Sequence, residues 1–355
     1  MSGAKRLAPE KGVLPVRASR AHVSGESAAQ TDSTLRNSLA SPSFELGSVR
    51  VRTYSSDELA ALLPMPDFDA NKYSRGKLTI VGGSAAYPGA ACIAAAASQR
   101  AGAGYTEVRC APEAMPVIQA FRPSVVVRSW KELASEDFVA TSLRKPCAYV
   151  VGCGLDASTK QGAAEAKELV CAVVKQAHAP VLVDGGGLNA LATRKGQRLL
   201  RRRFVNGWPT VITPHMGEAA RLAKPFGFST SDPGRLACLL ALAYGVVAVV
   251  KGPNTYVSDG EMVTCIDEGT PALAKAGTGD ALAGILGALL AQGLSAVDAA
   301  VLATVLHARA GKAAAQRLTD IGVAAEDVVE ALPDAIGSVA EGKSRFRRFG
   351  NKLHL

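Results

Sequence analysis

Short apolar runs rich in Val, Ile and Leu alternate with longer alanine-rich stretches from about Lys77 onward. Apolar runs without a polar alternation predict strands that are buried on both faces, and the alanine-rich stretches predict helices that cover a parallel sheet. We therefore expect one large α/β domain with a central, mostly parallel sheet and helices on both faces. The expected strands are Leu78–Gly82, Thr106–Cys110, Tyr149–Gly152, Val181–Asp184, Val211–Thr213, Val246–Lys251, Tyr256–Ser258 and Met262–Ile266.

The stretches between these strands contain little internal Gly or Pro, and a proline begins the first of them, where a helix tolerates it. We expect the last two helices to pack together. The expected helices are Pro88–Ala101, Gln161–Gln176, Asp232–Tyr244, Thr278–Gln292 and Ala296–Gln316.

The two ends of the chain differ from its body. Residues 1–50 are rich in Ser, Ala and Arg and lack a hydrophobic period, which predicts a disordered N-terminal extension before a domain at 51–336. Of the net charge of +9, residues 1–50 carry +3 and the C-terminal tail at 337–355 carries +4, so the domain holds only +2. This distribution argues against nucleic acid as a partner of the domain.

The spacing of the cysteines and histidines indicates the cellular compartment and whether a metal site is expected. The seven cysteines are scattered and never spaced as Cys-x-x-Cys, which predicts a reducing, cytoplasmic compartment, although an Arg- and Ser-rich N-terminus also suits a targeting segment. The five histidines match no metal-binding spacing, so we expect no metal site formed by protein ligands alone. No apolar stretch reaches the roughly 18 residues of a membrane span, and we expect no membrane contact.

Candidate chemistry gathers directly after the strands. Because ligands of parallel sheets lie at the carboxyl ends of the strands, these loops are expected to form one site. They are Gly82-Gly83-Ser84, Gly152-Cys153-Gly154, Asp184-Gly185-Gly186-Gly187, Thr213-Pro214-His215-Met216-Gly217-Glu218 and Lys251-Gly252-Pro253-Asn254-Thr255.

Gly277-Thr278-Gly279-Asp280 opens the apolar helix expected at Thr278–Gln292. Glycines let a ligand approach the backbone, and the free amides and dipole of a helix start favour an anion such as phosphate. The carboxylate of Asp280 is either an ordinary helix cap or a catalytic group.

A second glycine motif is rejected. Residues 337–344 match the phosphate-binding pattern Gly-x-x-x-x-Gly-Lys-[Ser/Thr], but such a loop follows an apolar strand, whereas a helix is expected before this segment.

With these loops in order, residues 55–335 resemble the ADP/ATP-dependent NAD(P)H-hydrate dehydratases, which have a ribokinase-like fold. The Gly-Thr-Gly-Asp segment alone indicates the ribokinase-like superfamily, and Thr213-Pro214-His215 with Gly217-Glu218 narrows the resemblance to the repair enzymes. The chain departs from the family pattern at Cys153, where proline is usual. Further matching segments are Val81-Gly82-Gly83-Ser84 with Gly89-Ala90, Gly152-Cys153-Gly154-Leu155, Asp184 with Leu188-Asn189, Lys251-Gly252 and the helix that contains His307.

The resemblance implies a metabolite-repair lyase that dehydrates hydrated NADH or NADPH (NADHX or NADPHX) with ADP or ATP as co-substrate and Mg2+ bound to the phosphates. The ring hydroxyl would be phosphorylated and then expelled as phosphate, with Asp280 as the base. It also implies that Ala90, Gly154, His215 and Asp280 bind the hydrated cofactor. The implied nucleotide-binding residues are Lys251, Gly252, Pro253, Asn254, Thr255, Gly277, Thr278 and Gly279.

Two alternatives stay open at this stage. A ribokinase-like kinase of a small vitamin-precursor alcohol would use the same loop but leave a stable phosphorylated product. A noncatalytic nucleotide-sensing module would bind ADP or ATP without turnover. We further expect a homo-oligomer, and an epimerase supplied by a separate protein, because about fifty residues before the domain are too few for another one.

Overall fold

The computed structural model describes residues 50–135 and 146–350, with side chains described as far as residue 341. Its sheet has ten strands in the order β1-β10-β9-β8-β7-β6-β5-β2-β3-β4. The strands from β4 to β8 are parallel, whereas β9 is antiparallel to both of its neighbours. The bounds are β1 Arg50–Arg52, β2 Lys77–Val81, β3 Tyr105–Cys110, β4 Val126–Ser129, β5 Cys147–Val151, β6 Val181–Val183, β7 Thr210–Ile212, β8 Val247–Val250, β9 Thr255–Ser258 and β10 Met262–Ile266.

The eight expected strands are confirmed to within two residues at each end. Two more strands, β1 and β4, lie at the two edges of the sheet, where a short strand needs less apolar sequence because a neighbour covers only one side. Arg50 to Arg52 pair in parallel with β10, so the described sheet begins at the last residue of the expected extension. Residues 1–49 lie outside the described residues.

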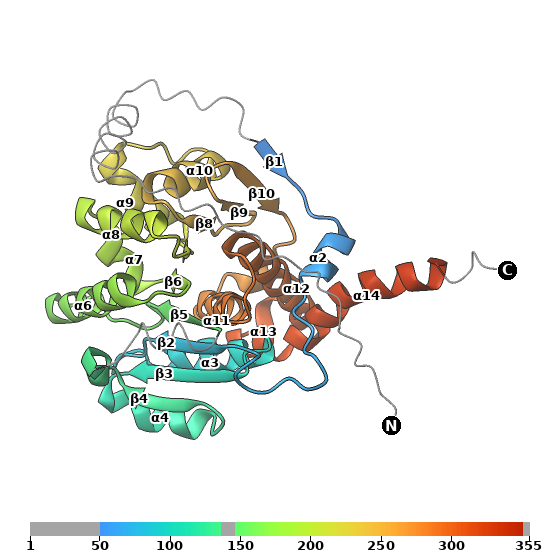
Figure 1. The fold of residues 1–355 in the computed structure, drawn as a ribbon, viewed down its shortest axis with the longest axis horizontal. Coiled ribbons are helices and arrows are strands. Elements are labelled where there is room, and N and C mark those ends of the chain that lie inside the picture. Colours follow the sequence, from blue (N-terminus) through green and yellow to red (C-terminus); the bar gives the residue numbers. More distant parts are fainter. Residues whose placement is uncertain (1–49, 136–145, 351–355) are drawn as a thin grey trace, which may run out of the picture. The chain divides into compact units, whose positions relative to one another are not determined.

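Helices cover the sheet on both faces (Figure 1). Helices α3 and α11 pack together over β2 and β5, while α6, α8 and α10 pack over β5 to β9. The helices are α2 Ser56–Leu62, α3 Pro88–Arg100, α4 Met115–Phe121, α6 Lys160–Gln176, α7 Gly186–Leu191, α8 Arg194–Val205, α9 Met216–Ala223, α10 Pro233–Tyr244, α11 Thr278–Ala291, α12 Ala296–Gly322, α13 Ala325–Glu330 and α14 Leu332–Gly350.

Small residues set the position of α11. A Cβ on Gly284 would lie 2.1 Å from the carbonyl oxygen of Ala94, so only glycine lets α11 approach the alanine-rich α3 this closely. Helix α11 also contacts α12, as expected for the last two predicted helices. Most of the alanine-rich segment 299–315 of α12 is buried within this chain, which assigns that face to packing inside the subunit.

The rejected glycine motif at 337–344 lies inside α14, and α13 precedes it instead of a strand. Because its backbone is helical, the motif does not form a phosphate-binding loop, and the rejection is confirmed. The tail expected at 337–355 therefore continues α14 as far as Gly350. Residues 351–355 lie outside the described part of the chain.

Candidate active site

The carboxyl ends of β6, β7 and β8 bring together a buried polar cluster. Asp184 follows β6 and is 3% exposed, Thr213 follows β7, and Lys251 follows β8. Thr213 Oγ1 donates a hydrogen bond of 2.7 Å to Asp184 Oδ1, and Lys251 Nζ lies 2.8 Å from the same oxygen. The Asp184 carboxylate is thus the centre of the site, held by one hydroxyl and one cation.

Lys251 stays charged in this setting. Burial acts to lower the pKa of Lys251, but the carboxylates of Asp184, Glu218 and Asp280 outweigh it, and the net result is a raised pKa. The backbone amide of Lys251 donates to the Pro214 carbonyl at 2.9 Å, so β8 continues beside the His215 loop. A Cβ on Gly279 would lie 3.4 Å from Lys251 Nζ, which places the ammonium group against the start of α11.

His215 and Glu218 form the start of α9. The amide of His215 donates to Glu218 Oε2 at 2.9 Å, and the amide of Gly217 donates to His215 Nδ1 at 3.0 Å. This reciprocal capping explains the Thr-Pro-His-x-Gly-Glu spacing in structural terms. Burial raises the pKa of Glu218, against the lowering effect of Lys251.

The start of α11 presents free backbone donors. Gly277 is the N-cap, with φ 90°, and no side chain caps this helix. Among the described residues, the amides of Gly279 and Asp280 have no backbone acceptor, whereas the Thr278 amide donates to the Lys275 carbonyl at 3.4 Å. The Thr278 hydroxyl oxygen lies 2.8 Å from the carbonyl oxygens of both Leu273 and Lys275, which share its one donor proton, and this contact fixes the loop before the helix.

The Asp280 side chain is not a helix cap. It occupies the third position of α11, and its carboxylate lies within 4.8 Å of ligand atoms of Cys153 and Asp184. Burial and the neighbouring charge of Asp184 raise the pKa of Asp280 to about 6, while the Cys153 thiol and Lys251 act to lower it. A carboxylate with a pKa just below neutral is suited to accept a proton in catalysis.

Cys153, Asp184 and Asp280 are of types that could bind a metal ion, and they are the only such group found among the described residues. The ammonium of Lys251 already lies against Asp184 and compensates its charge. The expectation that protein ligands alone form no metal site stays a prediction.

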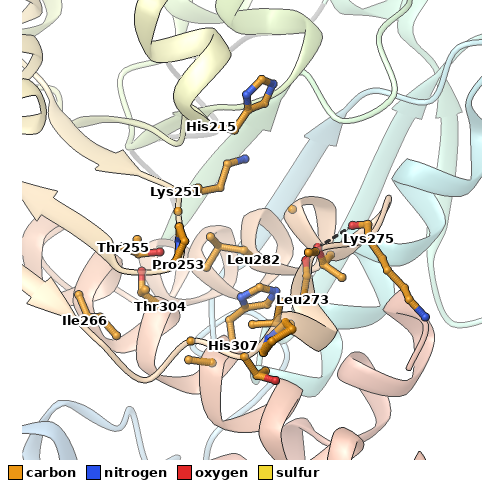
Figure 2. Close-up of a pocket in the computed structure, with 18 residues that line it drawn as sticks. His215, Lys251, Pro253, Thr255, Ile266, Leu273, Lys275, Leu282, Thr304 and His307 are labelled. Atoms are coloured by element: carbon orange, nitrogen blue, oxygen red, sulfur yellow. Dashed lines mark hydrogen bonds between the residues drawn. The ribbon is translucent and has the colours of Figure 1, made fainter. Parts of the chain in front are cut away.

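A pocket of about 710 Å³ lies beside this cluster. Figure 2 shows His215 and Lys251 at one end of it and Ile266, Thr304 and His307 toward the other. Six of the eight expected nucleotide-binding residues line the pocket: Lys251, Gly252, Pro253, Thr255, Thr278 and Gly279. Asn254 and Gly277 do not line it.

The expected residues for the hydrated cofactor divide between two places. His215 lines the pocket, whereas Ala90 and Gly154 lie together elsewhere, because a Cβ on Gly154 would be 2.9 Å from the Ala90 Cβ. Asp280 joins the two places: Gly279 before it lines the pocket, and Cys153 before Gly154 contacts its carboxylate.

The residues that the sequence assigned to the site do not include Asp184, Thr213, Glu218, Cys153 and His307, although all except His307 stand in the loops after the strands. His307 on α12 is buried, and its Nε2 has no hydrogen-bond partner among the described residues. Burial lowers the pKa of His307 to about 4, so the ring is neutral at pH 7.

A family model described as NAD(P)H-hydrate dehydratase matches residues 78–334 of this chain, a range that contains the whole candidate site. The chain belongs to the NAD(P)H-hydrate dehydratase family. An ADP-dependent (S)-NAD(P)H-hydrate dehydratase of Xanthomonas campestris is 32% identical over 301 residues, which cover 82% of this chain and 99% of that relative. A bifunctional NAD(P)H-hydrate repair enzyme of Escherichia coli is 33% identical over 288 residues, and the match covers 80% of this chain but 52% of that enzyme.

Solved structures show the fold of this NAD(P)H-hydrate dehydratase family member to be ribokinase-like. A ribokinase-like superfamily protein from Enterococcus faecalis has a TM-score of 0.66 at 23% identity, covering 82% of this chain and 96% of its own. The ADP/ATP-dependent NAD(P)H-hydrate dehydratase of Bacillus subtilis has a TM-score of 0.67 at 24% identity, covering 83% of this chain and 100% of its own. No helix in the described residues has the length and apolar character of a membrane span.

Proposed function

We propose that this chain is an ADP- or ATP-dependent (S)-NAD(P)H-hydrate dehydratase, a carbon–oxygen lyase that restores NADH or NADPH from the hydrated cofactor. The observation that supports this most is Asp280, a half-buried carboxylate with a pKa of about 6 at a helix start with free amides. The named relatives support the reaction: those of Xanthomonas campestris and Cenarchaeum symbiosum are ADP-dependent dehydratases matched over nearly their whole length.

In the first step Asp280 accepts the proton of the ring hydroxyl, and the oxygen of that hydroxyl attacks the terminal phosphorus of the nucleotide. The bond between that phosphorus and the bridging oxygen of the nucleotide breaks. The free amides of Gly279 and Asp280 at the start of α11 stabilise the charge on the transferred phosphoryl group.

In the second step the carbon–oxygen bond to the new phosphate breaks. The lone pair of the ring nitrogen displaces phosphate, which is a better leaving group than hydroxide, and a proton leaves the neighbouring ring carbon to give the reduced cofactor. The atoms of the removed water thus leave as part of the phosphate and as the released protons.

The residues that line the pocket support a proposed place for each part of the nucleotide. The phosphates lie by Lys251 and the start of α11, where a cation and free amides meet, and the base lies toward Ile266 and Leu273. Mg2+ enters bound to the phosphates; the Bacillus subtilis dehydratase was co-crystallized with ATP/Mg2+. Ala90 and Gly154 contact the hydrated cofactor on the other side of Asp280.

We also propose that epimerisation of the hydrated cofactor is supplied by another protein and that this chain works in the cytoplasm as a homo-oligomer. The chain spans about half the length of the Escherichia coli repair enzyme, which is described as bifunctional.

Product analysis tests this function against the two alternatives. Chemically hydrated NADH is incubated with ADP or ATP and Mg2+, and both reduced-nicotinamide absorbance and free phosphate are followed. A dehydratase restores absorbance and releases one phosphate for each cofactor. A kinase of a vitamin-precursor alcohol restores none and phosphorylates an alcohol instead, and a sensing module does neither.

A further inference from the structure

The thiol of Cys153 is held in one place by its backbone. The amide of Gly83 donates to the Cys153 carbonyl at 2.9 Å, and a Cβ on Gly82 would lie 2.1 Å from the same oxygen. The loop after β5 is therefore pressed against the loop after β2. Cys153 is 1% exposed, so its side chain has a fixed, solvent-free setting.

Two carboxylates surround this thiol. The Cys153 sulfur lies within 4.8 Å of carboxylate oxygens of both Asp184 and Asp280. Burial, together with the charges of Asp280 and Asp184, raises the pKa of Cys153 well above its usual range, so the sulfur keeps its proton. A protonated thiol is a hydrogen-bond donor.

The two carboxylates differ in what they already accept. Asp184 is bonded to Thr213 and to Lys251. The Asp280 carboxylate lies within 4.8 Å of the Cys153 sulfur, and the thiol acts to lower its pKa. A buried donor is therefore available to the carboxylate that is proposed to act as the base.

We propose that Cys153 is a positioning residue for Asp280: its thiol donates a hydrogen bond that orients the carboxylate and favours its ionised form. This inference rests on the proposed role of Asp280 as the base. The charged groups that act on Asp280 are Asp184 after β6 and Lys251 after β8, while Glu218 on α9 and His307 on α12 interact with Lys251. The charge of Asp184 opposes ionisation of Asp280, whereas the charge of Lys251 favours it. The thiol of Cys153 thus adds to the effect of Lys251.

The kinetic test compares Cys153→Ala, which removes the donor, with Cys153→Ser, which keeps one. Cys92→Ala is the matched control, because Cys92 is a buried cysteine on α3. A thiol is a weak donor, so its loss moves the acid limb of the kcat profile upward by roughly half a pH unit. In Cys153→Ala the KM for the nucleotide should stay at its wild-type value. Cys153→Ser and Cys92→Ala should keep the wild-type acid limb. An unchanged acid limb in Cys153→Ala overturns the proposal.

A second readout needs no turnover and separates this proposal from the proposed function. The S–H stretching band of Cys153 is the infrared band that the Cys153→Ala variant lacks. In a hydrogen-bonded thiol this band lies lower than in a free one, and Asp280→Asn, whose neutral side chain is a weaker acceptor, is expected to move it upward. A band that Asp280→Asn leaves unchanged overturns the hydrogen bond, even if the protein dehydrates hydrated NADH.

Discussion

Replacing the half-buried carboxylate at position 280 by its neutral amide is expected to stabilise the protein while removing the base. In the folded chain the pKa of Asp280 is raised from 3.8 to about 6, with burial as the largest cause. The folded state therefore binds the proton more tightly than the unfolded state. Between these two pKa values, stability falls as the pH rises, and above about 6 the whole cost of the buried charge is present.

The size of this cost follows from the two pKa values. At about 1.4 kcal/mol for each pH unit, the difference between 3.8 and about 6 corresponds to about 3 kcal/mol at neutral pH. Asp280→Asn carries no such cost, so its free energy of unfolding should exceed that of the wild type by up to about 3 kcal/mol near pH 7.5. The gain should fall to roughly half near pH 5 and to about a fifth near pH 4.

Denaturant unfolding of the ligand-free protein at these three pH values measures the difference. Asp67→Asn is the matched control, since it removes the same charge from an exposed position. A gain that is absent at neutral pH, or that does not shrink as the pH falls, refutes the reasoning that Asp280 is a strained, ionised base. A gain of the same size in Asp67→Asn would assign the effect to net charge instead.

Three further predictions concern the surroundings of the site. Lys251→Met should cost about 3 kcal/mol of unfolding free energy and raise the KM for the nucleotide, because it leaves a buried carboxylate without its cation; denaturant unfolding and steady-state kinetics measure both. The Arg203 guanidinium is buried and donates to the carbonyls of Val174, Ala177, Ala179 and Pro209, so Arg203→Met should cost about 3 kcal/mol or more in the same unfolding assay, and a wild-type midpoint would contradict this. Because the pKa of His307 is lowered to about 4, stability is complete above about pH 6.5 and falls as the pH drops toward 4. His307→Gln should remove about 2 kcal/mol of the loss between pH 7.5 and pH 5, and an unchanged pH dependence would contradict it.

The sequence predicted the parts of the fold that composition determines. The interior strands are uninterrupted apolar runs such as Val181–Val183, a pattern typical of strands that are buried on both faces. The edge strand Val126–Ser129 contains Arg128, and helix Arg194–Val205 is rich in arginine, so neither shows the apolar pattern that marks a buried element. The buried residues of helix α8 are Gly196, Leu200 and Arg203, and sequence periodicity does not distinguish Arg203 from its exposed neighbours.

The sequence predicted the loops that form the site and the base Asp280. It did not predict the contacts of Asp184 with Thr213 and Lys251. Asp280 and its helix start follow from local sequence, because glycines and a carboxylate at a helix start are adjacent in the chain. The partners of Asp184 are not adjacent: Lys251 is 67 positions away and Thr213 is 29. Their meeting depends on the strand order β6, β7, β8, which the sequence does not state.

Recovery of reduced-nicotinamide absorbance from chemically hydrated NADH, with ADP or ATP and Mg2+, tests the central claim most directly. The wild-type chain and the Asp67→Asn control should restore the absorbance, and folded Asp280→Asn should restore none. Recovery by Asp280→Asn at the wild-type rate would contradict the assignment of Asp280 as the base. A wild-type protein that restores no absorbance with either nucleotide would contradict the dehydratase itself.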